Sequence, residues 1–215
     1  MIKYLFGLPT YRASLLNERY NKEDLINVVL KNYNKDKNRN NWDKNSLEYS
    51  KIHHFLYDEA NPFFDTPNFN HLYPIYTKHI TNFLNNLKLK KNFNFNFKIV
   101  NYSCMTEGQH MKSHIHTHCD FSAIHYLKFD ENFNDSTLFY NPTSYSKFLN
   151  VLRPDILNYF DNKDEKNSWI FYNYKFNTKE DDLIIFPSVL EHGVPAVESK
   201  KHRITISFNI SLESL

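Results

Sequence analysis

The densest group of chemically active side chains lies within residues 110–120. Its members all have even numbers: His110, His114, His116, His118 and Asp120. Residues two apart on a β-strand share one face, so neighbouring imidazoles there lie roughly 6.6 Å apart along the chain and can converge on one metal ion. Neutral imidazole is a ligand for iron, zinc and copper. The pattern predicts a metal site that needs a further ligand from another segment.

Two pairs within this segment are candidate proximal ligands. One pair is His114 with His116, and the other is His118 with Asp120, which resembles the His-x-Asp half of a facial triad of metal ligands. The segment alone leaves both pairs open. The candidate third ligand is His192, which follows an apolar strand and lies directly before a glycine that lets the chain turn.

A second chemical signal lies in the predicted strand 203–210, where polar and apolar residues alternate. The apolar face consists of Ile204, Ile206, Phe208 and Ile210. The polar face consists of Arg203, Thr205, Ser207 and Asn209. We expect the apolar face to pack on the N-terminal helices, which leaves the Arg203 side to line a polar cavity. An arginine in such a cavity needs an anionic partner, because an unpaired buried charge is unfavourable.

The elements that position these residues divide into a helical front half and a β-rich back half. Apolar residues at helical spacing predict helices over 21–33 and 72–87. From residue 93 the period changes to two, which predicts a strand over 93–99. Further β-like segments follow at 110–118, 121–129, 136–141, 168–176, 182–187 and 203–210. The pattern predicts a mostly β fold of the α+β class, a sandwich or barrel buttressed by helices.

Composition excludes several common classes of protein. Only three glycines occur in 215 residues, and none lies close to another, so phosphate-binding loops, dinucleotide fingerprints and serine-hydrolase elbows are excluded. A net charge of +2 indicates neither a nucleic acid nor a membrane as partner. Two cysteines indicate no disulfide framework, and no apolar run is long enough for a signal peptide or a membrane span. We therefore expect a cytoplasmic protein.

The order of these segments resembles one enzyme family. A His-x-His or His-x-Asp segment precedes the strand Ser-Ala-Ile-His-Tyr-Leu, then come Leu-Ile-Ile-Phe-Pro, a histidine and Arg-x-Thr. This order resembles the Fe(II)- and 2-oxoglutarate-dependent dioxygenases, which fold as a double-stranded β-helix. It most resembles their phage and marine-bacterial branch of prolyl-hydroxylase-like proteins. The resemblance covers nearly the whole chain, and residues 182–209 are its most specific part.

The resemblance implies an architecture and a location. The fold would be a jelly-roll or cupin-like double-stranded β-helix buttressed by helices. Residues 91–215 would form this catalytic core, and residues 1–90 would form a helical and irregular elaboration packed on it, within one domain overall. The location would be the cytoplasm of a bacterium or of a phage-infected host cell.

The resemblance also implies roles for individual residues. His192 would be the distal iron ligand, and Arg203 would bind the C5 carboxylate of 2-oxoglutarate with Thr205 as the accompanying hydroxyl. Tyr126 matches a tyrosine that contacts the same carboxylate, and Tyr102 matches one that lines the cofactor pocket. A bidentate guanidinium with hydroxyl donors is the partner that a buried carboxylate requires.

For the proximal ligands we favour His114 and His116. This choice leaves residues 117–120 as a connection before the strand that starts at 121, whereas a ligand at Asp120 leaves almost no loop there. Asp120 stays a candidate ligand. A site of three histidines differs from the 2-His-1-carboxylate triad of non-haem oxygenases.

The implied activity is hydroxylation of a C–H bond of a protein side chain, as in prolyl hydroxylases, or of a small molecule. It would use Fe(II), 2-oxoglutarate and O2 and release succinate and CO2. The alternative is a cupin-like metal-binding barrel, an enzyme or a binding module, that does not use 2-oxoglutarate. Three histidine ligands favour the alternative, and Arg203 argues against it. The segments expected to select the substrate, 36–48 and 141–168, carry no motif.

Overall fold

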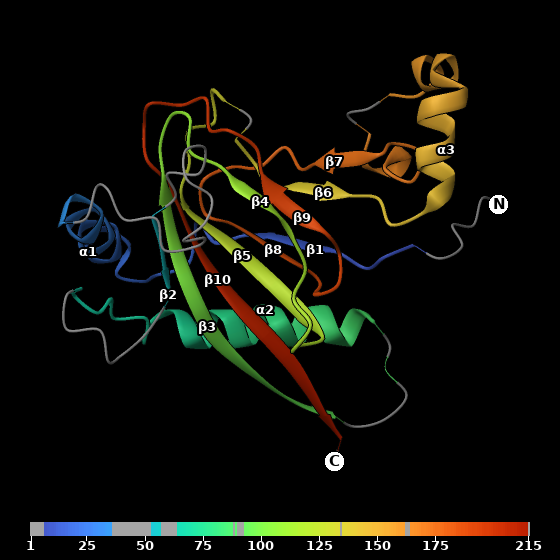
Figure 1. Cartoon of the computed structure of the whole chain (residues 1–215). Coiled ribbons are helices and arrows are strands. Elements are labelled where there is room, and N and C mark those ends of the chain that lie inside the picture. The colour runs from blue at the N-terminus through green and yellow to red at the C-terminus, as the bar shows by residue number, and fades with distance from the viewer. Residues whose placement is uncertain are drawn as a thin grey trace.

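The computed structural model shows two antiparallel sheets accompanied by helices (Figure 1). The mostly β fold with helices expected from the sequence is therefore confirmed. The residues that the structure describes are 7–35, 53–56, 64–87, 89, 93–133, 135–161 and 164–214. The segment 36–48, expected to select the substrate, lies outside them.

The larger sheet has six strands, and every neighbouring pair is antiparallel. Its order is β1 (Tyr11–Ser14), β8 (Asp182–Pro187), β5 (Phe121–Lys128), β10 (Arg203–Ser214), β3 (Phe93–Met105) and β2 (His53–Leu56). The two edge strands come from the part of the chain before residue 91, which the sequence pattern predicted as helical and irregular. Each has only four residues, too few to produce a recognisable alternation.

The smaller sheet has four short strands. Its order is β4 (Met111–His114), β9 (His192–Val194), β6 (Leu138–Tyr140) and β7 (Asn173–Lys175). The segment at His192, where the sequence indicated a turn at the following glycine, is itself a strand. The segment 141–168, expected to select the substrate, contains helix α3 (Ser144–Leu152) and two short 3₁₀ helices, η1 (Pro154–Tyr159) and η2 (Glu165–Asn167).

Two helices cover the larger sheet and confirm the helices predicted from spacing. They are α1 (Lys22–Lys35) and α2 (Leu72–Asn86), and α2 runs across the strands of the sheet (Figure 1). Tyr76 of α2 stacks on Phe208 with ring centroids 4.4 Å apart, and Phe83 meets Phe121 edge-on at 4.9 Å. The apolar face of β10 therefore packs on the N-terminal helices, as the alternation of strand 203–210 predicts.

Strand β3 contains one more residue than the part of β10 that it faces. Ser207 lies opposite Asn101, but the next residue of β10, Phe208, lies opposite Ile99, so one residue of β3 between them is left over. Such a β-bulge reverses which side chains face inward. Before the bulge, Ile99 packs in the hydrophobic core between the larger sheet and the helices, which we call the helix-side core. After the bulge, Tyr102 packs in the same core.

A buried charge cluster joins the start of β8 to the N-terminal segment. The carboxylate of Asp181 accepts hydrogen bonds from the Tyr20 hydroxyl and from Lys22 Nζ, the latter at 2.6 Å, and lies 3.5 Å from His125 Nε2. Burial raises the pKa of Asp181, but these neighbours outweigh burial and lower the pKa to about 2. The backbone of Asp181 has a φ of 64°, a conformation that Asp and Asn tolerate better than most residues.

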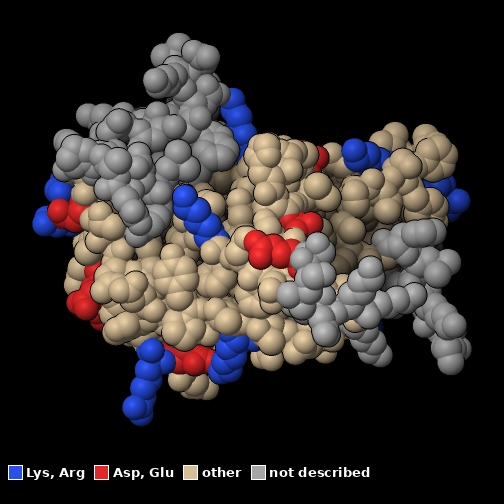
Figure 2. Space-filling view, turned by 90° about the horizontal axis from the view of Figure 1, so that it is seen from below, with Lys and Arg blue, Asp and Glu red and all other residues tan. Residues whose placement is uncertain are grey.

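The surface of the described residues is of mixed charge. Basic and acidic side chains are interspersed on the face shown in Figure 2. Among the described residues, no helix is long and apolar enough to cross a lipid bilayer. Cys104 and Cys119 are both free thiols.

Replacing Phe208 with alanine tests the packing of β10 on α2. Phe208 is fully buried, and deletion of a buried phenylalanine side chain lowers the free energy of unfolding by about 3–5 kcal/mol. Urea denaturation followed by circular dichroism measures this loss. Leu16→Ala is the control, because Leu16 is 71% exposed and should change stability by less than about 0.5 kcal/mol. Equal effects of the two substitutions would contradict the packing described.

Replacing Asp181 with asparagine tests the charge cluster, because asparagine keeps the size and tolerates the same backbone conformation. The folded pKa of about 2 lies below the unfolded value, so the carboxylate stabilises the fold above about pH 4 and this contribution is lost as the pH falls towards 2. We expect Asp181→Asn to lower the free energy of unfolding by about 2 kcal/mol at pH 7 and by roughly half as much at pH 3. Urea denaturation at both pH values measures the difference. A pH-independent difference would show that the charge is not the stabilising element.

Candidate functional site

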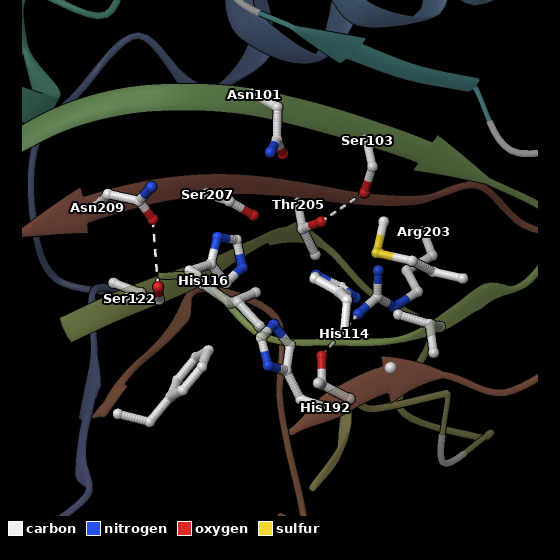
Figure 3. Close-up of a pocket in the computed structure, with 17 residues that line it drawn as sticks. Asn101, Ser103, His114, His116, Ser122, His192, Arg203, Thr205, Ser207 and Asn209 are labelled. Atoms are coloured by element: carbon white, nitrogen blue, oxygen red, sulfur yellow. Dashed lines mark hydrogen bonds between the residues drawn. The ribbon is translucent and has the colours of Figure 1, made fainter. Parts of the chain in front are cut away.

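Three histidines from neighbouring strands of the smaller sheet form one cluster (Figure 3). His114 ends β4, His116 follows two residues later, and His192 begins β9 opposite His114. Their candidate ligand nitrogens all lie within 4.8 Å of one another. Two nitrogens bound to one ion at about 2.1 Å each lie no more than about 4.2 Å apart, so small side-chain rotations bring all three onto one metal.

Backbone carbonyls fix the orientation of two of these rings. Nδ1 of His114 lies 2.9 Å from the carbonyl oxygen of Lys112, and Nδ1 of His192 lies 2.8 Å from that of Leu190. A carbonyl oxygen only accepts hydrogen bonds, so each Nδ1 carries the hydrogen. The Nε2 lone pair of each ring is then left for a metal ion.

Burial keeps the cluster uncharged. It lowers the pKa of His192 to about 3, with a further lowering from the neighbouring His114, and it lowers the pKa of His116 to about 4. The pKa of His114 is lowered by the same cause. The neutral form is the one that binds metals, so the site offers three ligands near neutral pH.

Gly193 allows β9 to approach β4 closely enough to bring the histidines together. A Cβ atom at Gly193 would lie 3.0 Å from the carbonyl oxygen of Met111 and 3.1 Å from the backbone nitrogen of Ser113. A side chain at this position would therefore push the two strands apart.

The backbone of His116, the second proximal histidine, is held in place by a hydrogen bond. Its N–H donates to the carbonyl oxygen of Ser188 at 2.9 Å.

Arg203 lines the same pocket as the histidines and is 3% exposed. Its Nε donates to the carbonyl of Asp135 at 2.8 Å, its Nη2 donates to Thr137 Oγ1 at 3.3 Å, and its Cζ lies 5.2 Å from the centre of the Tyr126 ring. Of the carboxylates in the described residues, none lies within ion-pair distance of this guanidinium. Guanidinium has five N–H donors in a fork that matches a carboxylate. The arrangement is therefore suited to binding an anion beside the histidine cluster.

Thr205, one pocket-facing position further along β10, also lines the pocket. Its hydroxyl shares a 2.7 Å hydrogen bond with Ser103 on β3 (Figure 3). The polar face of the predicted strand 203–210 thus lines a cavity, as expected.

The other predicted site residues lie outside the pocket. Asp120 is exposed and accepts a hydrogen bond from Leu212 N–H at 2.8 Å, away from the histidine cluster. Tyr126 is fully buried beside Arg203, and its hydroxyl donates to Thr137 Oγ1 at 2.8 Å. It contacts the arginine and does not itself line the pocket.

Tyr102 requires a correction. It was expected to line the cofactor pocket, but it lies in the helix-side core, where its hydroxyl accepts a hydrogen bond from Asn32 Nδ2 at 2.8 Å. The side chains of β3 that do line the pocket are its neighbours Asn101 and Ser103. The cause is strand alternation, since Tyr102 lies between them and points to the opposite face.

Several pocket residues carry no signal of their own in the sequence. Ser122, Ser207, Asn209, Asn101 and Thr137 line the pocket, and serine and asparagine are frequent throughout the chain. For Ser207 and Asn209 the signal was their shared face with Arg203 on strand 203–210. For Asn101 the bulge in β3 removed any such signal.

Comparison with known proteins agrees with this geometry. The family model for 2OG-Fe(II) oxygenases matches residues 101–209, just over half of the chain, and this range includes the three clustered histidines and Arg203. No curated protein matches the sequence.

Two solved structures share the fold at low sequence identity. One is a prolyl hydroxylase from Trichoplax adhaerens in complex with a hypoxia-inducible-factor peptide fragment, with 10% identity, a TM-score of 0.55, and coverage of 94% of this chain and 83% of that one. The other is a Pseudomonas putida prolyl-4-hydroxylase, with 11% identity, a TM-score of 0.53, and coverage of 95% and 93%. With the match over residues 101–209, the chain belongs to the 2OG-Fe(II) oxygenase family.

Proposed function

We propose that His114, His116 and His192 hold the iron and that Arg203 with Thr205 holds the distal carboxylate of 2-oxoglutarate, for hydroxylation of a substrate C–H bond. One observation carries this proposal: a buried guanidinium without a carboxylate partner among the described residues lines the same pocket as three neutral imidazoles. Bound iron with 2-oxoglutarate and O2 supplies the oxidising chemistry, which releases succinate and CO2.

The contribution of the chain itself is to position an anion. The Asp135 carbonyl and Thr137 hydroxyl hold the guanidinium of Arg203 from behind, so its remaining donors are preorganised for a carboxylate. An incoming carboxylate also offsets the unfavourable burial of an unpaired cation. Burial lowers the pKa of Arg203 from its usual value, and it outweighs the opposing effects of Tyr126 and of the Asp135 carboxylate.

Tyr126 is best described as a positioning residue. Its hydroxyl donates to Thr137, whose hydroxyl in turn accepts from Arg203, so the tyrosine orients the arginine through one intermediate side chain. This role differs from direct contact with the cosubstrate, which the resemblance implied. For Tyr102 the helix-side position argues against any role in cofactor binding.

We also propose the double-stranded β-helix for residues 91–215. The strand order supports it, because strands from β3 to β10 fall into two facing sheets, β8-β5-β10-β3 and β4-β9-β6-β7, and successive strands mostly alternate between them. Residues 1–90 would be an elaboration of this core, adding β1 and β2 as edge strands and α1 and α2 as a helical cover. The domain division and the cytoplasmic location both stay predictions.

The leading substrate is a protein side chain, prolyl by resemblance, with small molecules as the other class. The Trichoplax prolyl hydroxylase, solved with a peptide fragment, offers a precedent for a peptide on this fold. The alternative function is a metal-binding barrel that does not use 2-oxoglutarate. It is supported by the three-histidine cluster, which no carboxylate joins in the described part of the chain. This alternative function provides no anion for the buried Arg203, and we therefore favour the oxygenase.

Substitution of single residues tests the metal ligands. Substitution of a residue that only hydrogen-bonds to a metal ligand lowers metal affinity about 10–100-fold. Substitution of a ligand itself should have at least this effect, so His192→Ala should weaken Fe(II) binding by at least about tenfold. Anaerobic equilibrium dialysis measures the affinity. His118→Ala and Asp120→Asn are the matched controls from the rival ligand pair and should bind Fe(II) like the unaltered protein. A loss with Asp120→Asn as large as with His192→Ala would overturn the three-histidine assignment.

Arg203→Lys tests the anion site, because lysine keeps the charge and loses the bidentate fork. A hydrogen bond to a charged group contributes about 1.5–3 kcal/mol, so we expect the KM for 2-oxoglutarate to rise at least about tenfold while Fe(II) affinity stays unchanged. Succinate formation after reconstitution with Fe(II) gives the KM. Lys200→Ala, at an exposed position three residues away, is the control. An unchanged KM in Arg203→Lys would contradict the assignment.

A further inference from the structure

We propose that Asn101, Ser207 and Asn209 form an amide-binding ledge in the pocket, on which the primary substrate places an uncharged amide group. The inference rests on the proposed function, because it assigns the other end of the pocket, at Arg203, to 2-oxoglutarate. It adds a specificity determinant to the oxygenase site. The shared chemistry is the amide, which a polypeptide offers in its backbone or in the carboxamide of an Asn or Gln side chain.

The ledge is built by cross-strand neighbours on three adjacent strands. Asn101 of β3 lies opposite Ser207 of β10, and Asn209 of β10 lies opposite Ser122 of β5. Side chains directly opposite each other have Cβ atoms about 4.5–5.5 Å apart, and residues two apart on one strand are roughly 6.6 Å apart. All four side chains line the pocket. Their polar groups therefore form one compact surface (Figure 3).

Several polar groups of this surface have no hydrogen-bond partner among the described residues. The side chains of Asn101 and Ser207 make no hydrogen bond to any other residue that the structure describes, although Asn101 is only 8% exposed. Asn209 Oδ1 accepts from Ser122 Oγ at 3.2 Å, which leaves the NH₂ group of Asn209 without a protein acceptor among those residues. Asn101 is buried and Ser207 and Asn209 are half-buried, and their polar groups reach the pocket, where they are free to bond to a ligand. Together they offer both donors and acceptors.

The ledge carries no charge. Among the described residues, no Asp or Glu lines the pocket, and its sole Lys or Arg is Arg203. Arg203 lies six residues from Asn209 along β10, which is roughly 20 Å of extended strand. In the view of Figure 3 the three histidines lie between these two ends.

The absence of charge at the ledge restricts the chemical class of substrate. A free amino acid brings an ammonium and a carboxylate close to its reactive carbon, and neither has a partner at the ledge, so its desolvation would be unfavourable. A peptide amide brings one donor and one acceptor with no charge. A neutral sugar also needs hydrogen bonds, but Phe186, the one Phe, Tyr or Trp that lines the pocket among the described residues, is fully buried and offers no face for a sugar ring.

The test uses the full chain reconstituted with Fe(II) and 2-oxoglutarate and three sets of probes. The first is a pool of N-acetylated, C-amidated pentapeptides randomised at every position. The second is the twenty free amino acids, and the third is a panel of neutral monosaccharides. Succinate formation and a gain of one oxygen in mass are measured for each set. We expect the blocked peptide pool to stimulate succinate formation at least threefold over the probe-free rate and to gain oxygen, and the other sets to do neither.

Two variants connect the stimulation to the ledge. Asn209→Asp keeps the size of the side chain and replaces its NH₂ donor with an acceptor, so it should raise the half-saturating concentration of the peptide pool at least fivefold. The double variant Asn101→Ala with Asn209→Ala should do the same. Asn85→Ala, at an exposed position on α2, is the matched control. The KM for 2-oxoglutarate should change less than twofold in the ledge variants, because Arg203 and Thr205 are untouched.

A second peptide pool without Asn and Gln distinguishes the two sources of the amide. Stimulation that persists with this pool assigns the ledge to the peptide backbone, and stimulation that disappears assigns it to a side-chain carboxamide; both outcomes support an amide ledge. Stimulation by free amino acids or sugars in place of peptides overturns the inference, as does an unchanged half-saturating concentration in Asn209→Asp. No stimulation by the peptide pool, with 2-oxoglutarate turnover intact, overturns the ledge and leaves the proposed function standing. If the unaltered protein forms no succinate from 2-oxoglutarate with any of the probes, the proposed function itself is contradicted.

Discussion

Strand β10 serves the structure with both of its faces: one makes hydrophobic contacts with the helices, and the other presents polar groups to the pocket. Ile204, Ile206, Phe208 and Ile210 pack against the helices, and the alternate residues from Arg203 to Asn209 line the pocket. Because successive side chains of a strand point to opposite faces, a shift of the apolar residues of β10 relative to the helices would also move the pocket-lining residues. The hydrophobic contact between β10 and α2 therefore sets the orientation of the pocket residues. The same strand that completes the core positions the anion site relative to the histidines.

The electrostatics of the pocket follow from which groups are buried there. Three imidazoles are held neutral by burial, and one guanidinium is enclosed without a carboxylate partner in the described part of the chain. Arg203 is the one Lys or Arg that lines the pocket among the described residues, and a divalent cation on the histidines would add to its positive charge. A dicarboxylate that reaches both the arginine and the metal would largely balance this charge. Because no carboxylate of the described residues joins the histidine cluster, the compensation depends more on the cosubstrate than in a site with an acidic ligand.

Sequence reasoning identified the parts of the site whose residue types are chemically distinctive. The histidines could be singled out because they recur at the two-residue spacing of a strand, and Arg203 because arginine is almost never fully buried unless it is paired. The role of Tyr102 was taken from the family resemblance, and the pattern of β3 could not correct it, because no residue type marks the bulge that sets which residues face the pocket. Ser207 and Asn209 could be predicted only from the face that they share with Arg203. Asn101 and Ser122 could not be predicted, since asparagine is abundant in this chain and only tertiary placement distinguishes one such residue from another. The edge strands β1 and β2 depend on neighbours distant in sequence, so local pattern could not reveal them.

The bulge in β3 decides which side chains of this strand face the pocket. Before and after the bulge, residues of opposite parity lie on the pocket side of the sheet, so Ile99 and Tyr102 both belong to the helix-side core while Asn101 and Ser103 line the pocket. If the same residues paired without the bulge, the one-residue slip would turn the ring of Tyr102 towards the histidines and move Asn101 and Ser103 into the apolar layer under α2. Deletion of the one unpaired residue would instead remove the bulge and leave Asn101 and Ser103 on the pocket side. A change of pairing register in this single strand, rather than a change in its length, would therefore give a different pocket surface with the same metal ligands.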